Sequence, residues 1–295
     1  MPLIAPDNHM AVMAALFVIA GAAFLLERTR LGANLTGAVI AILAAIVAAN
    51  LGLIPHDAPA YGFVFTYVVP VLIPLFLFKA DLRKIVLEAT RTTMAFLLAA
   101  AGTVAGVTVA ALLLDLSALG AAAPLAADQR EPAIAGLFTS TYIGGSVNYA
   151  ALGDLTGLRE DASFFSAATA ADNLFSAVYL GLLALMPGWA WLARRFSSHD
   201  HAESMVEEVG PPITSMSLCL ALAVAMSIVA ITDAVVASFA LSGWRYVIIT
   251  GIALAFATLA PGLAKRLAGS FELGVALSFV FFAAIAAGAD VVAML

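Results

Sequence analysis

The 295-residue sequence is poor in the side chains on which soluble redox enzymes and nucleic-acid-binding proteins depend. Its one cysteine, Cys219, lies in an apolar run, so a disulfide framework or a cysteine metal cluster has no ligands. Charged residues make up 11% of the chain, and the lysines and arginines do not cluster. We therefore expect no metal site, no cofactor and no nucleic-acid partner.

Apolar residues dominate instead: they make up 63% of the chain, and the mean hydropathy is +1.06. This composition predicts an all-α, multi-pass protein of the cell inner membrane. A bilayer crossing takes roughly 20 apolar residues. On that basis we predict nine segments near 9–26, 34–53, 62–78, 93–114, 133–152, 163–187, 214–236, 246–262 and 271–289. Pro70 and Pro74 should kink the third of them.

The distribution of Lys and Arg suggests how the fifth segment is arranged, because cytoplasmic loops are enriched in these residues. If the fifth segment crosses fully, the two sides hold eight and five cations. If it makes no net crossing, the division is ten and three. The ten would be Arg28, Arg30, Lys79, Arg83, Lys84, Arg91, Arg194, Arg195, Lys265 and Arg266, and the three Arg130, Arg159 and Arg245. The second division favours a discontinuous or re-entrant fifth segment.

This topology makes the two halves of the chain inverted repeats, the arrangement of many secondary transporters. Residues 75–82 close the third segment and residues 284–291 close the ninth, with Asp81 and Asp290 in matching positions. We predict a first repeat of six segments over 1–196, a polar linker over 197–213 and a partial second repeat of three segments over 214–295. The second repeat would then be truncated.

Residues 139–148 (Thr-Ser-Thr-Tyr-Ile-Gly-Gly-Ser-Val-Asn) form a polar, glycine-broken passage inside the fifth segment. A helix broken at membrane depth is tolerated only where it is buried in protein or lines a wet cavity. We predict that Gly144 and Gly145 supply the break, and that Thr141, Ser146 and Asn148 contact a solute. The alternative is a glycine-mediated helix contact whose Ser and Thr side chains bond back to their own turn.

Asp172 lies about ten residues into the sixth segment. A carboxylate at such depth costs roughly 2.5–3.5 kcal/mol on insertion scales and marks a functional site by default. Thr169 and Asn173 are one turn away and adjacent, so we predict that the three hold a coupling cation, either a sodium ion or a proton. The alternative is an Asp172 tied to a hydroxyl of the fifth segment, with no transport role.

An intramembrane hydrolase is a rival function, with Ser146 as nucleophile. Such a serine needs a base within hydrogen-bond reach. The four histidines, His9, His56, His199 and His201, fall in loops or at segment ends. We expect no catalytic residues and no enzyme activity, whereas a passive channel or a structural membrane component remains an alternative.

Three motifs carry a family resemblance: residues 74–82 (Pro-Leu-Phe-Leu-Phe-Lys-Ala-Asp-Leu), 141–148 (Thr-Tyr-Ile-Gly-Gly-Ser-Val-Asn) and 170–173 (Ala-Ala-Asp-Asn). With them the sequence resembles the YjcL-like family of uncharacterised bacterial integral membrane proteins. That family is distantly similar to the cation/proton antiporter and bile-acid sodium symporter superfamily, whose members have inverted repeats with broken helices. The resemblance implies secondary transport, with substrate or ion at 144–148 and the coupling cation at Asp172 and Asn173. Family members carry a second Gly-Gly segment, which is absent from this chain.

Together these observations predict an ion-coupled secondary transporter of a small solute, with an organic anion preferred because half-helix N-termini should converge on the site. The expected partners are the lipid bilayer, the small-molecule solute and a second copy of the chain in a homodimer.

Overall fold

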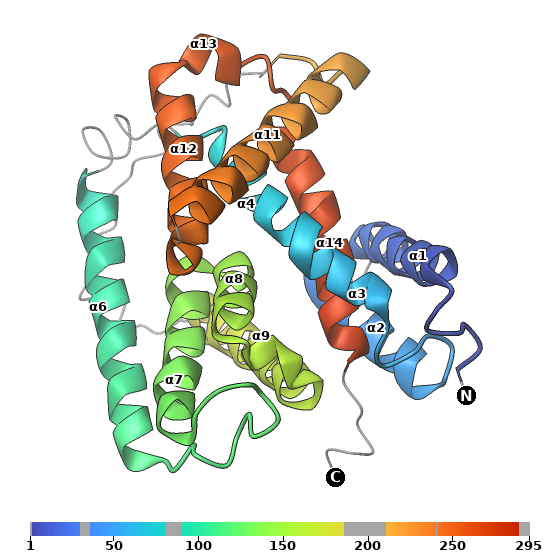
Figure 1. The fold of residues 1–295 in the computed structure, drawn as a ribbon, viewed down its shortest axis with the longest axis vertical. Coiled ribbons are helices and arrows are strands. Elements are labelled where there is room, and N and C mark those ends of the chain that lie inside the picture. The colour runs from blue at the N-terminus through green and yellow to red at the C-terminus, as the bar shows by residue number, and fades with distance from the viewer. Residues whose placement is uncertain (1, 30–35, 81–89, 186–210, 240, 289–295) are drawn as a thin grey trace.

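The computed structural model describes residues 2–29, 36–80, 90–185, 211–239 and 241–288, and all the regular structure in them is helical. The predicted linker up to residue 210, the Asp81 and Asp290 ends of the repeat match, His199 and His201 lie outside these residues. Figure 1 shows the helices, whose bounds are α1 His9–Glu27, α2 Gly37–Asn50, α3 Pro59–Phe63, η1 Val64–Val68, α4 Val69–Leu77, α6 Thr90–Leu113, α7 Ala127–Gly144, α8 Ser146–Thr156, η2 Leu158–Glu160, α9 Ala162–Leu185, α11 Ser215–Phe239, η4 Ser242–Trp244, α12 Arg245–Leu259, α13 Pro261–Ala264 and α14 Ser270–Ala287.

Each of the nine predicted segments contains a helix, and the fifth contains two, α7 and α8. Five helical stretches are long and apolar enough to cross a bilayer: His9–Glu27, Pro59–Leu77, Thr92–Leu113, Ser215–Phe239 and Ser270–Ala287. Helices α2 and α12 are apolar but shorter. The chain is therefore an all-helical, polytopic membrane protein, and the number of nine crossings stays a prediction.

The third segment is irregular where its prolines predict it. A π-helix over Val64–Val68 separates α3 from α4, and the Val69 amide donates to the Val64 carbonyl instead of to the carbonyl four residues back. Pro70 and Pro74 lack amide donors. A π-helical turn widens the helix by one residue and is frequent at functional sites.

Six segments pack into one unit, which we call the six-helix body. In it α1 and α2 pack against each other and against α14, whereas α11 and α12 pack against each other and against α4. Helices α4 and α14 also contact one another. The first two helices of each predicted half thus pack on the third helix of the other half.

The remaining helices, α6 to α9, form the hairpin unit, which lies beside the body and contacts it mainly through α8 on α4 and α9 on α14. Within it α7 and α8 run antiparallel and turn at Gly144 and Gly145. The two far ends of this hairpin meet, because the Ala122 amide donates to Asp161 Oδ2 across 3.1 Å. The fifth segment therefore enters and leaves at one end of the bundle.

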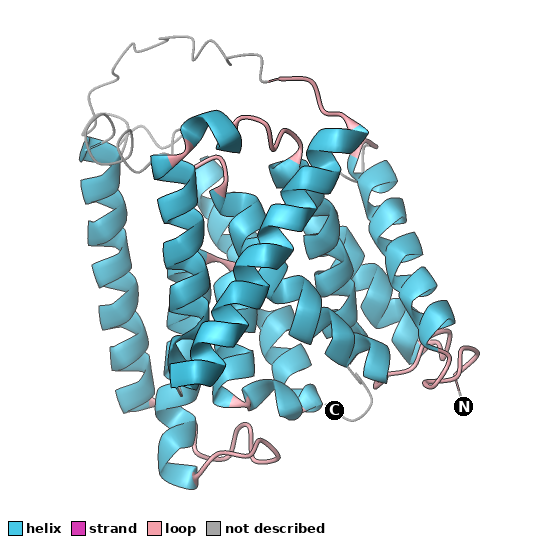
Figure 2. Ribbon diagram, turned by 45° about the horizontal axis from the view of Figure 1, so that its top comes forward, coloured by secondary structure: helices cyan, strands magenta, loops and turns pink. Residues whose placement is uncertain are grey.

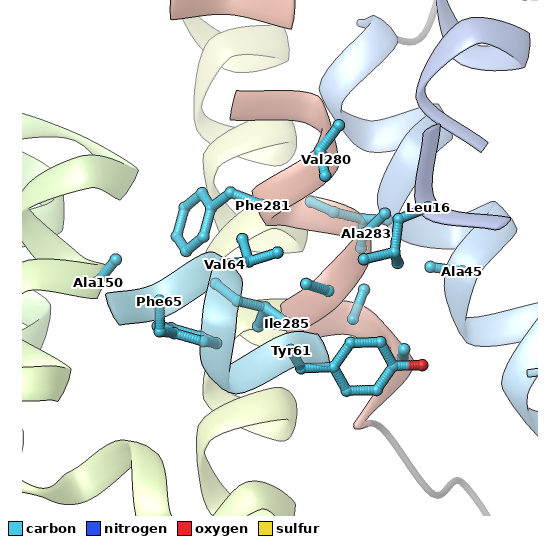
Figure 3. Packing of buried hydrophobic residues seen from close by; sticks show 14 of the residues in the cluster. Leu16, Ala45, Tyr61, Val64, Phe65, Ala150, Val280, Phe281, Ala283 and Ile285 are labelled. Carbon is cyan, nitrogen blue, oxygen red and sulfur yellow. The ribbon is translucent and has the colours of Figure 1, made fainter. Parts of the chain in front are cut away.

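The apolar core joins the two units (Figure 3). Tyr61, Val64 and Phe65 of the third segment lie between α14 and the hairpin unit. The Phe65 ring meets Phe281 of α14 edge-on at 5.7 Å and Phe165 of α9 at 6.0 Å. Aromatic pairs at these separations add to the stabilisation that burial itself provides.

The described cations separate between the two ends of the bundle. Arg28, Lys79, Lys265 and Arg266 follow helices that end at the upper side of Figure 2, where α13 lies. Arg130, Arg159 and Arg245 lie on the hairpin near its far ends and at the start of α12, at the other side. This is the side assignment that the sequence gives when the fifth segment makes no net crossing.

Candidate functional site

The hairpin tip depends on a conformation that only glycine adopts readily. Gly145 has φ +83° and ψ −178°, a region that is essentially closed to residues with a Cβ atom. Its amide donates to the Thr141 carbonyl across 2.7 Å, which ends α7, while its carbonyl accepts from the Asn148 amide at the start of α8. No atom lies within 4 Å of the position that a Cβ on Gly145 would occupy. The tip is therefore open on this side.

Gly144 and Asn148 are in direct contact at the tip. A Cβ atom on Gly144 would overlap the amide nitrogen of Asn148, so the bare Cα of Gly144 makes room for that side chain. Asn148 and Gly144 are both exposed, and Ser146 between them is half-buried. The tip thus presents one amide, one hydroxyl and the N-terminus of an 11-residue helix together.

The hydroxyls just before the tip divide into two groups. Thr139 donates to the Ala135 carbonyl at 2.8 Å and Ser140 to the Leu137 carbonyl at 2.7 Å, as the packing interpretation of this passage predicts. Thr141 is buried and instead donates to Asp172 Oδ2 of α9, 3.1 Å away. Only the last of these three hydroxyls is directed out of its own helix.

Asp172 is 8% exposed, and its two carboxylate oxygens have different surroundings. Oδ2 accepts the bond from Thr141, whereas Oδ1 has no hydrogen-bond partner among the residues that the structure describes. The phenol of Tyr142, 46% exposed, interacts electrostatically with the same carboxylate. A buried carboxylate oxygen without a partner is costly unless a proton or a cation completes it.

Tyr149 is a member of the cluster that the sequence interpretation missed. It is 2% exposed, its ring stacks on Phe165 at 4.7 Å, and its hydroxyl donates to the Phe165 carbonyl at 3.1 Å. The Thr169 hydroxyl lies 3.2 Å from the Tyr149 hydroxyl and donates to the Phe165 carbonyl at 2.7 Å. A tyrosine one residue after Asn148 in a polar, glycine-broken passage was the available signal.

The structure thus brings the predicted residues into two neighbouring groups. Thr141, Thr169 and Asp172 lie buried between the hairpin and α9. Gly144, Gly145, Ser146 and Asn148 lie at the tip, whose first residue is three positions beyond Thr141. Asn173 is on α9 beside Asp172 in the chain, and its side chain lies outside the described part.

A family model described as a protein of unknown function, DUF819, matches residues 14–295. The chain belongs to the DUF819 family. This DUF819 chain is also 29% identical over 289 residues to the uncharacterized membrane protein YjcL of Bacillus subtilis (strain 168), an alignment that covers 90% of this chain and 69% of the relative. No solved structure matches it. The resemblance carried by the three motifs is confirmed.

These relationships agree with a multi-pass membrane protein, because YjcL is itself named a membrane protein. Neither name states a substrate or an activity. The chemistry of the site therefore has to support any function.

Proposed function

We propose that this DUF819 protein is an ion-coupled secondary transporter of a small solute, with an organic anion as the preferred class. The observation that carries the proposal is Asp172, a buried carboxylate with one unpartnered oxygen, next to the tip of a glycine-turned hairpin. An ionisable residue inside a membrane protein marks an ion or proton pathway by default.

In this proposal the coupling ion binds at Asp172. A sodium ion would take Oδ1 together with the Thr141 hydroxyl oxygen, whereas a proton would neutralise the carboxylate directly. Thr169 and Asn173 stay candidate ligands from the same helix. The hard oxygen atoms of this set suit an alkali cation.

The solute would bind at the tip, close to the ion. Helix α8 begins at Ser146, and a helix N-terminus carries roughly +0.5 of an elementary charge, which favours an anionic group. Ser146 and Asn148 would orient the solute, and the open side of Gly145 gives it access. Thr141 contacts Asp172, so a change at the ion site reaches the tip within one helical turn.

Two features of the fold support the transporter architecture. A hairpin whose ends meet at one end of the bundle is the expected form of a re-entrant fifth segment. The six-helix body supports the inverted repeat: Asp81 and Asp290 stand 209 positions apart (290 minus 81), and the same shift carries α2, Gly37–Asn50, onto 246–259, which overlaps α12, Arg245–Leu259. The exchanged packing of the two helix pairs is what a two-fold relation would produce.

The proposal assigns no catalytic step. His9 begins α1, and His56 Nδ1 lies 3.0 Å from the Ala287 carbonyl at one end of the bundle, so neither is the base that Ser146 would need as a nucleophile. A homodimer belongs to the same proposal, and the mass of the protein in nanodiscs would measure it.

Uptake into proteoliposomes tests the function. Small mono- and dicarboxylates would be offered under a sodium gradient, a proton gradient or neither. We expect uptake above equilibrium with one of the gradients, and none with Asp172→Asn. Asp128→Asn, which removes an exposed carboxylate from the same hairpin, is the matched control. Flux that only follows the solute gradient would favour the passive channel instead.

A further inference from the structure

A second polar cluster joins the hairpin unit to the six-helix body, away from the tip. Asp154 of α8 accepts a hydrogen bond from the Tyr246 hydroxyl of α12 at 2.9 Å through Oδ2, and pairs with Arg159 Nε at 2.8 Å through Oδ1. Asp154 lies nine residues beyond Gly145, roughly 13 Å along an α-helix. The cluster is therefore separate from the candidate solute site.

Arg159 makes the second contact with the body. Its guanidinium lies over the ring of Phe65 in η1, 5.2 Å from the centroid, a cation–π geometry. Gly157, with φ +75°, turns the chain between Asp154 and Arg159 and allows the two charges to meet. Both charged residues belong to the hairpin unit, and both of their partners on the other side belong to the body.

The charges of this cluster are balanced within the hairpin unit. If the hairpin base moves away from the body, Asp154 and Arg159 stay paired, and only a neutral phenol and an aromatic ring are lost. The side chains of Arg159 and Asp154 are already 26% and 21% exposed, so water can replace the Tyr246 hydroxyl. Opening here leaves no charge without a partner, which distinguishes the cluster from a buried salt bridge between the two units.

We propose that Asp154, Arg159 and Tyr246 form a latch that holds the base of the hairpin unit to α12 and opens when the two units separate at this end. The closed state is the one in the structure. The latch acts on the interface between the units and takes no part in binding ion or solute.

Hydrogen exchange of the full chain in nanodiscs, read by mass spectrometry, tests the latch. The amides of Gly157, Glu160 and Asp161 are hydrogen-bonded in the turn at the hairpin base and report its opening. In Tyr246→Phe we expect these amides to exchange about fivefold faster, the change that corresponds to the loss of one hydrogen bond. Exchange in α1 and α2 should stay unchanged.

Asp233→Asn is the matched control. Asp233 pairs with Arg245, the neighbour of Tyr246, but both of its helices, α11 and α12, lie in the body. Its exchange at the hairpin base should equal that of the wild type. A double variant of Tyr246→Phe with Asp154→Asn should exchange no faster at the base than Asp154→Asn alone, because both changes remove the same bond.

Unchanged exchange at the base in Tyr246→Phe would overturn the proposal. An equal acceleration throughout the chain would also overturn it, because that result indicates general destabilisation and no local opening. The measurement needs neither ion nor solute, so its failure would leave the proposed transport function standing, and the reverse also holds.

Discussion

Thr141 on α7 donates a hydrogen bond to Asp172 on α9 across 3.1 Å, within one helical turn of the hairpin tip. This contact links the broken fifth segment to the one acidic side chain buried deep in the described part of the sixth. The two predicted groups of site residues are therefore neighbours in space, although 31 positions separate these two in the sequence.

The Thr141 hydroxyl should contribute measurably to stability. Thr141→Val keeps the shape of the side chain but leaves Asp172 Oδ2 without its donor, which should lower the free energy of unfolding by about 1–3 kcal/mol. Thermal unfolding in detergent micelles measures the change. Thr139→Val removes a hydroxyl bonded to its own helix and should cost within about 0.5 kcal/mol. Equal effects of the two substitutions would contradict the role given to the Thr141 bond.

Gly145 should tolerate no other residue well. Gly145→Ala places a Cβ in a backbone region that is essentially limited to glycine and should destabilise the protein by about 1–3 kcal/mol. Gly21→Ala in α1 is the comparison, because nothing lies within 4 Å of that Cβ position and alanine favours the helix by about 1 kcal/mol. Similar melting temperatures for both variants would show that the tip is not fixed in this conformation.

Gly144 and Asn148 should affect the solute and spare the ion. Gly144→Ala displaces the Asn148 amide from the tip, and Asn148→Ala removes it. Both variants should take up solute more slowly while keeping the response of the wild type to the coupling ion in a thermal unfolding assay. If either variant loses the ion response as well, the ion and the solute do not occupy separate groups of residues.

Much of this architecture could be predicted from the sequence because its signals are local. Apolar length predicts where the helices lie, Gly144 and Gly145 predict the interruption, and the division of Lys and Arg favours a fifth segment without net crossing. The hairpin, with the Ala122 to Asp161 bond across its ends, has the form that this division requires.

The details of the site were less accessible, for a physical reason. Thr139, Ser140 and Thr141 are consecutive hydroxyls, and whether each bonds to its own helix or to a neighbour depends on tertiary packing. The same holds for Tyr149, whose composition signal is that of any buried aromatic residue. The exchanged packing of the helix pairs on α4 and α14 also involves contacts between distant parts of the chain, which no local pattern contains.

The most direct test of the central claim is the thermal stability of the purified protein and of Asp172→Asn in sodium chloride and in choline chloride at matched ionic strength, repeated across pH. A ligand that binds only the folded state at a hundredfold excess over its Kd stabilises it by roughly 2.7 kcal/mol. We predict that sodium ions or protons stabilise the wild type and Asp128→Asn specifically, and that Asp172→Asn loses this response. If the wild type and Asp172→Asn respond identically to sodium and to pH, Asp172 is not the coupling site.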